Sequence, residues 1–317
     1  MTSEPTYLEK HPEAPEVSVV VPVYNSASSL EALFERTKAT MEEIGKSWEM
    51  VMVYDGGDLE CWEIMKGLKT AHPNHLTAIR LARNFGQHGA TLCGINHSRG
   101  AFVVTIDDDL QTPPEEIPKL LARQEETDTD VVFGVYPNKQ HGLLRNLGSR
   151  FLKAVFRYLV NGIRDGSSFR LITRPIADKI AKHRQHFVFL DQVIAWYTLD
   201  IAYVDVTHQK RADGKSGYSG WKLMRLAFNI LISYTDLPLK IMTWTGLTAS
   251  VLSLAIGTFF IVQKAVNGSA VGFTALIVAI FFSASIILLS LGILGEYIGR
   301  IYSARTEKPN YSIKTKL

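Results

Sequence analysis

Two long stretches in the C-terminal third of the sequence contain no charged residue. They are Ile241–Val262 and Val271–Leu294, and a short segment separates them. A helix needs about 20 apolar residues to cross the roughly 30 Å hydrocarbon core of a bilayer, so each stretch is long enough to span it. Helices buried in a soluble core are the alternative, but such helices rarely run this far without a charge. The sequence therefore predicts a hairpin of two transmembrane helices.

The charges around these stretches predict how the hairpin is oriented. The whole chain has a net charge of +3, yet the residues from Ile201 onward carry +7 and those before carry −4. The linking segment holds one cation, Lys264, whereas the outer flanks hold Lys222, Arg225, Lys240, Arg300, Arg305, Lys308, Lys314 and Lys316. Because cytoplasmic flanks carry the excess of Lys and Arg, both termini and the large N-terminal region are expected to be cytoplasmic.

The region before the hairpin alternates between strand-like and helix-like segments. Val17–Val23 is a continuous β-branched run, which is typical of a strand buried on both faces of a parallel sheet. Further strands are expected over 49–53, 76–81, 101–106 and 130–135, with helices over 28–44, 61–71, 88–98 and 114–127. This alternation predicts an α/β doubly wound sheet that binds its ligands beyond the carboxyl ends of the strands.

Three consecutive aspartates, Asp107, Asp108 and Asp109, follow the fourth expected strand directly. Adjacent carboxylates repel one another unless a cation neutralises them. Oxygen ligands suit Mg²⁺ or Mn²⁺, which usually bridges to substrate phosphates. A solvated acidic loop is the alternative, but the position at the ligand-binding edge of a buried sheet favours a metal site.

Several other classes of site lack support in the sequence. The two cysteines, Cys61 and Cys93, have no metal-ligand spacing, and the nine histidines form no HxxxH pair, so a zinc site is not expected. Ser167 and Ser168 lie in no G-x-S-x-G motif, and a P-loop is absent. No nucleic-acid-binding module is present, so no nucleic-acid partner is expected.

Five motifs resemble the inverting GT-A glycosyltransferases of family 2 that act on polyprenyl phosphates. They are VSVVVPVYN (17–25), RNFGQHGA (83–90), TIDDDLQTPPEEIPKLL (105–121), RADGKSGYS (211–219) and LGEYIGRIY (294–302). This family includes dolichol-phosphate mannose synthases and bacterial undecaprenyl-phosphate glycosyl- and aminoarabinosyl-transferases. The resemblance implies a GT-A (nucleotide-diphospho-sugar transferase, Rossmann-like) domain, followed by interfacial helices and the two-helix transmembrane hairpin.

The resemblance also implies roles for individual residues. Those implied to hold Mg²⁺ or Mn²⁺ on the donor diphosphate are Asp107, Asp109 and Gln111. Those implied to bind the nucleotide sugar are Pro22, Tyr24, Asn25, Asp55, Arg83 and Asp108. Asp165 is implied near the acceptor as a further catalytic residue. Those implied to meet phosphate or the acceptor are Arg145, Arg170, Arg211, Lys215 and Ser216.

Four positions depart from the family pattern. Tyr54 stands where the family usually has Asp or Asn, and Gly57 where it usually has Ser. Ser26 occupies a position that is often Glu. Tyr136 replaces an arginine that meets phosphate in some members, a task that Lys139, Arg145 or Arg150 would take over.

The expected function is transfer of a single sugar, with inversion, from a nucleotide sugar to undecaprenyl phosphate or a similar polyprenyl phosphate. A UDP-sugar is favoured over a GDP-sugar, and the product is expected to serve cell-envelope glycan or lipid modification at the inner (cytoplasmic) membrane. A membrane-anchored binding or scaffold protein with an inactive transferase domain is the first alternative. A processive polysaccharide synthase is the second, but its QxxRW motif reads QVIAW here, with Ala195 in place of the arginine.

The expected organisation has five parts. A flexible tail (1–16), which is polar and unlike a signal peptide, precedes the catalytic domain (17–210). Amphipathic helices (211–239) follow; their mix of cations and aromatics suits the membrane interface, or docking onto the catalytic domain. The hairpin (240–296) and a basic cytoplasmic tail (297–317) complete the chain. The hairpin also suggests a homo-oligomer that associates through its helices.

Overall fold

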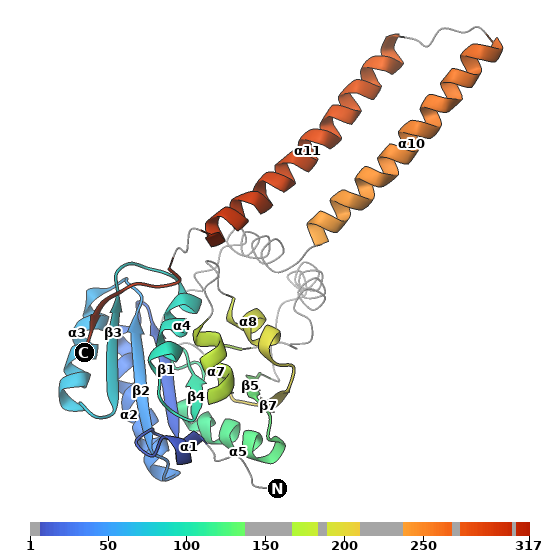
Figure 1. Cartoon of the computed structure of the whole chain (residues 1–317). Helices are drawn as coiled ribbons and strands as arrows, with labels where there is room; N and C mark the ends of the chain where they lie inside the picture. The colour runs from blue at the N-terminus through green and yellow to red at the C-terminus, as the bar shows by residue number, and fades with distance from the viewer. Residues whose placement is uncertain (1–6, 137–166, 183–188, 210–236, 268–272, 306–308) are drawn as a thin grey trace. The chain divides into compact units, whose positions relative to one another are not determined.

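The computed structural model describes residues 7–136, 167–182, 189–209, 237–267, 273–305 and 309–317. The chain divides into two units. The first comprises residues 1–217 together with 309–317, and the second comprises 218–308. Each unit has its own architecture, and Figure 1 shows the elements of both.

The first unit is built around an eight-stranded mixed sheet, with strand order β7-β5-β6-β4-β1-β2-β3-β8. The strands are β1 (Val17–Val23), β2 (Trp48–Tyr54), β3 (Leu76–Leu81), β4 (Phe102–Thr105), β5 (Val131–Val135), β6 (Arg170–Thr173), β7 (Ile201–Asp205) and β8 (Ile313–Lys316). The five strands expected from the sequence are confirmed within one or two residues. Three more were not expected, and two of these, β6 and β8, are antiparallel to their neighbours. The sheet is therefore mixed and not a purely parallel one.

Helices cover both faces of this sheet. They are α1 (Tyr7–Lys10), α2 (Ala27–Glu43), α3 (Leu59–Ala71), α4 (Gln87–His97), the 3₁₀ turn η1 (Pro114–Glu116), α5 (Ile117–Thr127), α7 (Arg174–Ala181) and α8 (Leu190–Tyr197). One core packs α2, α3 and α5 against the sheet, and a second packs α4, α7 and α8 against its other face. In β1, Val19 and Val21 join the first core while Val20 joins the second. All seven β1 residues are buried because side chains alternate between two covered faces.

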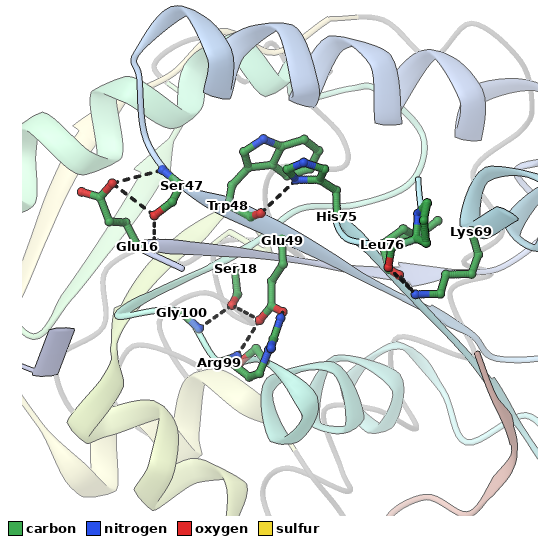
Figure 2. Close-up of polar contacts among 12 residues, drawn as sticks. Glu16, Ser18, Ser47, Trp48, Glu49, Lys69, His75, Leu76, Arg99 and Gly100 are labelled. Atoms are coloured by element: carbon green, nitrogen blue, oxygen red, sulfur yellow. Dashed lines mark hydrogen bonds and ion pairs between the residues drawn. The ribbon is translucent and has the colours of Figure 1, made fainter. Parts of the chain in front are cut away.

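A buried polar network joins the strands at the amino end of the sheet (Figure 2). Glu49 is buried, and its carboxylate accepts hydrogen bonds from Ser18 Oγ at 2.7 Å and from the Arg99 guanidinium at 2.8 and 2.9 Å. Ser18 Oγ in turn accepts the Gly100 amide at 2.7 Å. A buried carboxylate without such partners would be strongly destabilising. This network fixes β1 and β2 to the turn before β4, at the edge opposite the aspartates.

The C-terminal segment differs from the expected tail. Strand β8 pairs antiparallel with β3 at the edge of the sheet, and the Ala82 amide donates to Ser312 O at 2.7 Å. The Leu317 amide donates to Ala78 O at 2.9 Å. Such pairing covers the main-chain groups that an edge strand leaves exposed. Residues 309–317 thus belong to the first unit, and Ile313–Lys316 form a strand of its sheet.

The described part of the N-terminal segment is also structured. Helix α1 is one turn long, and Tyr7 OH donates to Arg99 O at 3.2 Å. The Ala101 amide donates to Pro15 O at 3.1 Å, and Glu16 pairs with Lys46 at 2.8 Å. Residues 7–16 therefore pack along the first unit instead of forming the flexible tail that the sequence suggested.

The second unit contains two long helices, α10 (Leu237–Asn267) and α11 (Phe273–Arg305). Helix α10 extends beyond the predicted stretch 241–262 at both ends, and α11 begins at Phe273 and extends beyond the C-terminal end of the predicted stretch 271–294. Within the described residues, one stretch, Phe282–Gly299 in α11, is long and apolar enough to cross a membrane. The hairpin is confirmed as a pair of helices, and the membrane-spanning prediction is supported for α11. Most of the expected interfacial segment 211–239 lies outside the described residues.

Candidate active site

The aspartate turn follows β4 at the carboxyl end of the sheet. The Ile106 amide donates to Val20 O at 3.0 Å, which carries the pairing with β1 one residue past the strand. Asp108 Oδ2 accepts the Tyr24 amide at 2.8 Å, and Asp108 O accepts a hydrogen bond from Ser29 Oγ. Asp108 is therefore used to tie the turn to the segment after β1. The other two aspartates are left as the candidates for chemistry.

Asp107 is held from two sides. Its Oδ1 accepts Gln87 Nε2 at 2.6 Å, and its Oδ2 accepts a hydrogen bond from Ser168 Oγ. Burial raises the pKa of Asp107, and the Ser168 hydrogen bond opposes the shift. Burial likewise raises the pKa of Asp108 to about 6, although the Tyr24 amide favours its ionised form. A cation beside these carboxylates would relieve the cost of keeping them ionised.

The residues of this turn fit a divalent metal of the Mg²⁺ or Mn²⁺ kind. Asp107 and Asp109 supply hard oxygen donors two residues apart, and Asp109 Oδ1 also accepts the Gln111 amide at 3.1 Å. Among the residues that the structure describes, no three His, Cys, Asp or Glu side chains gather as a closed metal cluster. Mg²⁺ is commonly bound by one or two carboxylates with substrate phosphates completing its coordination, so two aspartates are a sufficient donor set.

Four of the predicted nucleotide-binding residues, Tyr24, Asn25, Asp55 and Arg83, lie on the loops after β1, β2 and β3. Tyr24 is 51% exposed, and Asn25 adopts a left-handed backbone with φ of 55°. Asn25 Oδ1 accepts the Asp58 amide at 2.7 Å, which links the first two loops. Pro22 is buried at the end of β1 and lines a pocket beside Asp107. These loops bring the predicted residues to one edge of the sheet.

Asp55 has a structural partner in the third loop. Its carboxylate is buried, and Oδ1 accepts the Phe85 amide at 2.7 Å. Burial raises the pKa of Asp55, while the amides of Phe85 and Gly86 oppose the shift. The Arg83 guanidinium lies 4.6 Å from the Phe85 ring centroid. Asp55 therefore shapes the loop that carries Arg83, and its predicted contact with the base stays a prediction.

Two of the departures from the family pattern fit together. Tyr54 is 2% exposed, and its hydroxyl donates to Gly57 O at 2.9 Å. Gly57 has φ of +89°, and a Cβ atom there would overlap Asn25 Oδ1. A serine at position 57 would be strained here, so glycine suits the loop that Tyr54 holds. Ser26 Oγ donates to Tyr24 O at 3.1 Å and so supports the first loop.

Tyr136 packs beside the turn. Its hydroxyl is 2.6 Å from Thr112 Oγ1, and its ring centroid is 4.4 Å from that of His208. Burial raises the pKa of Tyr136, so the residue remains a neutral phenol. Tyr136 therefore supports the chain after Gln111, whose carbonyl accepts the Gln209 amide at 2.8 Å.

A pocket of about 160 Å³ has Asp107 in its lining. The residues that line it are Pro22, Gln87, His88, Thr91, Thr105, Ile106, Asp107, Ser167, Ser168, Arg170 and Asp191. Arg170 is 3% exposed and forms an ion pair with Asp191. Arg170 was expected to meet phosphate or the acceptor, and that contact stays a prediction.

Most of the residues that line this pocket were not predicted from the sequence. His88 was expected to hold a loop; its ring packs against Phe189 with centroids 5.1 Å apart. Desolvation lowers the pKa of His88 to about 4, and Arg170 adds to that shift. Asp191 and Ser168 were not identified as site residues, because neither lies in a recognisable motif. The antiparallel pairing of β6 with β4 brings Ser168 to Asp107, and Asp191 comes from α8 to pair with Arg170.

Several predicted site residues lie outside the described residues. They are Asp165, Arg145, Arg211, Lys215 and Ser216, and also Lys139 and Arg150.

Comparison with known proteins agrees with this architecture. Residues 18–192 match the model of Glycosyl transferase family 2, and residues 237–301 match that of the GtrB C-terminal hairpin. The chain is 33% identical over 303 residues to an undecaprenyl-phosphate 4-deoxy-4-formamido-L-arabinose transferase of Salmonella paratyphi A, covering 94% of this chain and 92% of that protein.

Two solved structures are also similar. A mannosyl-3-phosphoglycerate synthase from Rubrobacter xylanophilus has a TM-score of 0.50 at 16% identity, covering 73% of this chain and 76% of that one. A mannosyltransferase from Pyrobaculum calidifontis, in complex with GDP-Man and Mn²⁺, has a TM-score of 0.48 at 16% identity, covering 92% and 86%. At 16% identity, the similarity to the mannosyl-3-phosphoglycerate synthase supports the fold and no statement about function.

Proposed function

The chain belongs to glycosyl transferase family 2, and from this membership we propose that it transfers one sugar from a nucleotide sugar to undecaprenyl phosphate. The glycosyltransferase class follows from the family match and from relatives aligned over most of the chain. The lipid acceptor is supported by the name of the Salmonella relative and by the matching C-terminal hairpin. The single observation that carries the proposal is the Asp107–Asp109 turn at the carboxyl edge of the sheet.

The nucleophile in this proposal is the lipid phosphate. A phosphate monoester with a second pKa of about 6 is largely dianionic at neutral pH, so it needs no strong general base. One of its oxygens forms a bond to the anomeric carbon of the donor as the bond to the nucleoside diphosphate breaks. The departing diphosphate takes the electron pair, and displacement from the opposite face inverts the anomeric centre.

The residues of the turn prepare the site for the departing diphosphate. Asp107 and Asp109 would hold a Mg²⁺ or Mn²⁺ ion, which supplies positive charge where negative charge develops. Gln87 and Ser168 orient the Asp107 carboxylate through their hydrogen bonds to its two oxygens. Asp108, held by the Tyr24 amide, sets the distance between the turn and the first loop. This preorganisation lets the carboxylates act without moving during the reaction.

Three finer features belong to the same proposal. The donor is a UDP-sugar in preference to a GDP-sugar, on the resemblance of the motifs to bacterial members of the family. The hairpin spans the inner membrane twice, with both termini and the catalytic unit cytoplasmic, because the flanking cations favour that side. The apolar surface of the helices is a candidate contact between copies of the chain.

The test uses the full-length protein in detergent or nanodiscs. Labelled nucleotide sugars, Mg²⁺ or Mn²⁺ and undecaprenyl phosphate are expected to give a lipid-linked monosaccharide, which chelation of the metal abolishes. Asp109→Asn is expected to lower product formation at least about 100-fold. Asp128→Asn is the matched control, because Asp128 is exposed, lies outside the site and has a left-handed backbone that Asn tolerates. Absence of product with every donor, or full activity in Asp109→Asn, would contradict the proposal.

A further inference from the structure

We propose that the pocket beside Asp107 holds the donor's sugar ring, and that its Arg170–Asp191 pair selects an uncharged monosaccharide. The inference rests on the proposed function, because it concerns the donor that such a transferase would use. Arg170 begins β6 and Asp191 lies in the first turn of α8, so two elements outside the predicted nucleotide loops build this wall.

The size of the pocket suits one ring. Its volume is about 160 Å³, and Asp107, a candidate ligand of the metal, lies in its wall. A protein cavity of roughly 150 Å³ takes up a six-membered ring such as benzene. A single sugar ring is therefore the largest unit that this pocket takes in, whereas a disaccharide or a polyprenyl chain is too large for it. The position next to Asp107 is also where a sugar attached to a metal-bound diphosphate would lie.

The polarity of the walls suits hydroxyl groups. Gln87, Ser168 and Thr91 contribute polar atoms to the lining. Arg170 Nε is buried and has no hydrogen-bond partner among the described residues, although the same guanidinium pairs with Asp191 through another nitrogen. Arg170 also lines the pocket, so its guanidinium is placed to donate a hydrogen bond to an oxygen of a bound sugar.

The charges of the walls disfavour a charged sugar. Arg170 and Asp191 neutralise each other, and the lowered pKa of His88 leaves that ring uncharged. A carboxylate on the sugar would be desolvated near Asp191, and an ammonium group would be desolvated near Arg170. When a metal ion neutralises Asp107, neither charge would find an unmatched partner in the lining, and burying an unmatched charge is costly. Donors whose sugar bears only hydroxyl or acylated amino groups are therefore the class that this pocket accepts.

The acceptor phosphate is the competing occupant. It would be drawn to Arg170, but the same site would set its two negative charges against Asp191. A small pocket also offers no exit for the attached lipid. The two occupants predict different kinetic changes when the pair is altered, so one experiment separates them.

The experiment compares donors that share one nucleotide and differ only in the sugar: a neutral hexose or pentose, a uronic acid and a free amino sugar. Equilibrium binding to the full-length protein with Mn²⁺ is measured alongside turnover. The wild type is expected to bind the neutral donor at least about 10-fold more tightly than either charged donor. Asp191→Asn leaves the Arg170 cation unmatched and is expected to shift the preference toward the uronic acid by about 10-fold or more.

Two controls keep the result interpretable. The free nucleoside diphosphate is expected to bind Asp191→Asn and wild type within about twofold of each other, and Asp128→Asn is expected to match wild type in every assay. Arg170→Lys keeps the charge but removes the guanidinium group, and is expected to weaken binding of the neutral donor about fivefold while binding of the nucleoside diphosphate is unaffected.

Three outcomes would overturn the inference. One is a wild type that binds charged and neutral donors equally. Another is a folded Asp191→Asn with unchanged donor preference. A third is a change in the KM for undecaprenyl phosphate with no change for the donor, which would assign the pocket to the acceptor. Donor binding is measured without acceptor, so failure of lipid transfer alone would count against the proposed function and not against this pocket.

Discussion

The loops after β1, β2 and β3 and the wall formed by β6 and α8 flank the same aspartates by different means. The loops are held by main-chain groups: Asp108 accepts the Tyr24 amide, and Asp55 accepts the Phe85 amide. The wall is held by a buried ion pair between Arg170 and Asp191. Loops held by main-chain hydrogen bonds can adjust to a ligand. A buried ion pair makes it costly to place an additional, unmatched charge beside it. We therefore expect the loops to bind the nucleotide and the wall to choose the sugar.

The largest effect is expected from a substitution of Asp107, which lies between the loops and the wall. Asp107→Asn keeps the shape of the side chain but takes away one charged ligand and one of the acceptors that Gln87 and Ser168 use. We expect kcat/KM to fall at least about 100-fold. Binding of the nucleoside without its phosphates is expected to stay within about twofold, because the loops do not depend on Asp107.

Steady-state kinetics and titration calorimetry on the full chain measure both quantities, with Asp128→Asn as control. An equal loss of nucleoside binding would mean that the two sides do not act separately.

The second prediction concerns the wall alone and uses pH. The pKa of His88 is lowered from 6.5 to about 4, so between these values the unfolded chain binds a proton that the folded chain excludes. The free energy of unfolding therefore decreases as the pH falls below 6.5, because protonation then favours the unfolded chain. At pH 5 this loss in the free energy of unfolding, relative to pH 7, amounts to about 2 kcal/mol.

His88→Gln has no such proton to bind. The wild type is expected to lose about 4–8 °C more than the variant in its melting temperature between pH 7 and pH 5. Thermal unfolding of the full chain in detergent, with chelator present, measures the difference. Parallel melting curves for the two proteins would show that His88 is not excluded from protonation in the fold.

The loops and the wall also differ in how far the sequence predicted them. The run Val17–Val23 and the aspartates after the fourth strand indicated a buried sheet and its binding edge, because both patterns are local. The wall depends on β6, a short antiparallel strand whose sequence RLIT has no distinctive period. Ser168 reaches Asp107 through that pairing, and Asp191 joins the same pocket from α8 through its ion pair with Arg170, so no local pattern could reveal either residue.

The C-terminal strand shows the same limit. Ile313–Lys316 reads as the end of a basic tail, because its lysines match the cations expected outside the hairpin. Its pairing with β3 joins segments far apart in the sequence. The charge pattern predicted which side of a membrane this segment occupies, and could not predict that it closes an edge of the sheet.

The third prediction concerns the loops alone. Gly57→Ala places a Cβ atom against Asn25 Oδ1 at a φ of +89°. We expect nucleoside diphosphate affinity to fall about 10-fold, because backbone strain of this kind costs about 1–3 kcal/mol. The ranking of sugars in the donor panel is expected to stay the same.

Gly45→Ala is the matched control, since Gly45 also has a positive φ, of +65°, but has no atom within 4 Å of the added Cβ. It separates the cost of the backbone conformation from the loss of the Asn25 contact. A change in donor ranking in Gly57→Ala would contradict the division between loops and wall.

The smallest expected effect tests how the loop after β2 is held. Tyr54→Phe removes the hydroxyl that donates to Gly57 O and leaves the buried ring in place. A single hydrogen bond is worth about 1 kcal/mol, so nucleoside diphosphate affinity is expected to fall about threefold to fivefold. Tyr7→Phe is the control, because Tyr7 OH donates to a carbonyl at Arg99, beyond the opposite edge of the sheet.

The double variant Tyr54→Phe/Gly57→Ala tests whether these two positions are energetically coupled. If Tyr54 acts by holding the Gly57 peptide in its left-handed conformation, the strain from the added Cβ already displaces that peptide. The hydroxyl then has little left to contribute, and the combined loss of affinity is expected to be smaller than the sum of the two single losses by about 0.5 kcal/mol or more. Strict additivity would mean that Tyr54 supports the strand and not the loop, and that Gly57 alone sets the path of the chain around Asn25.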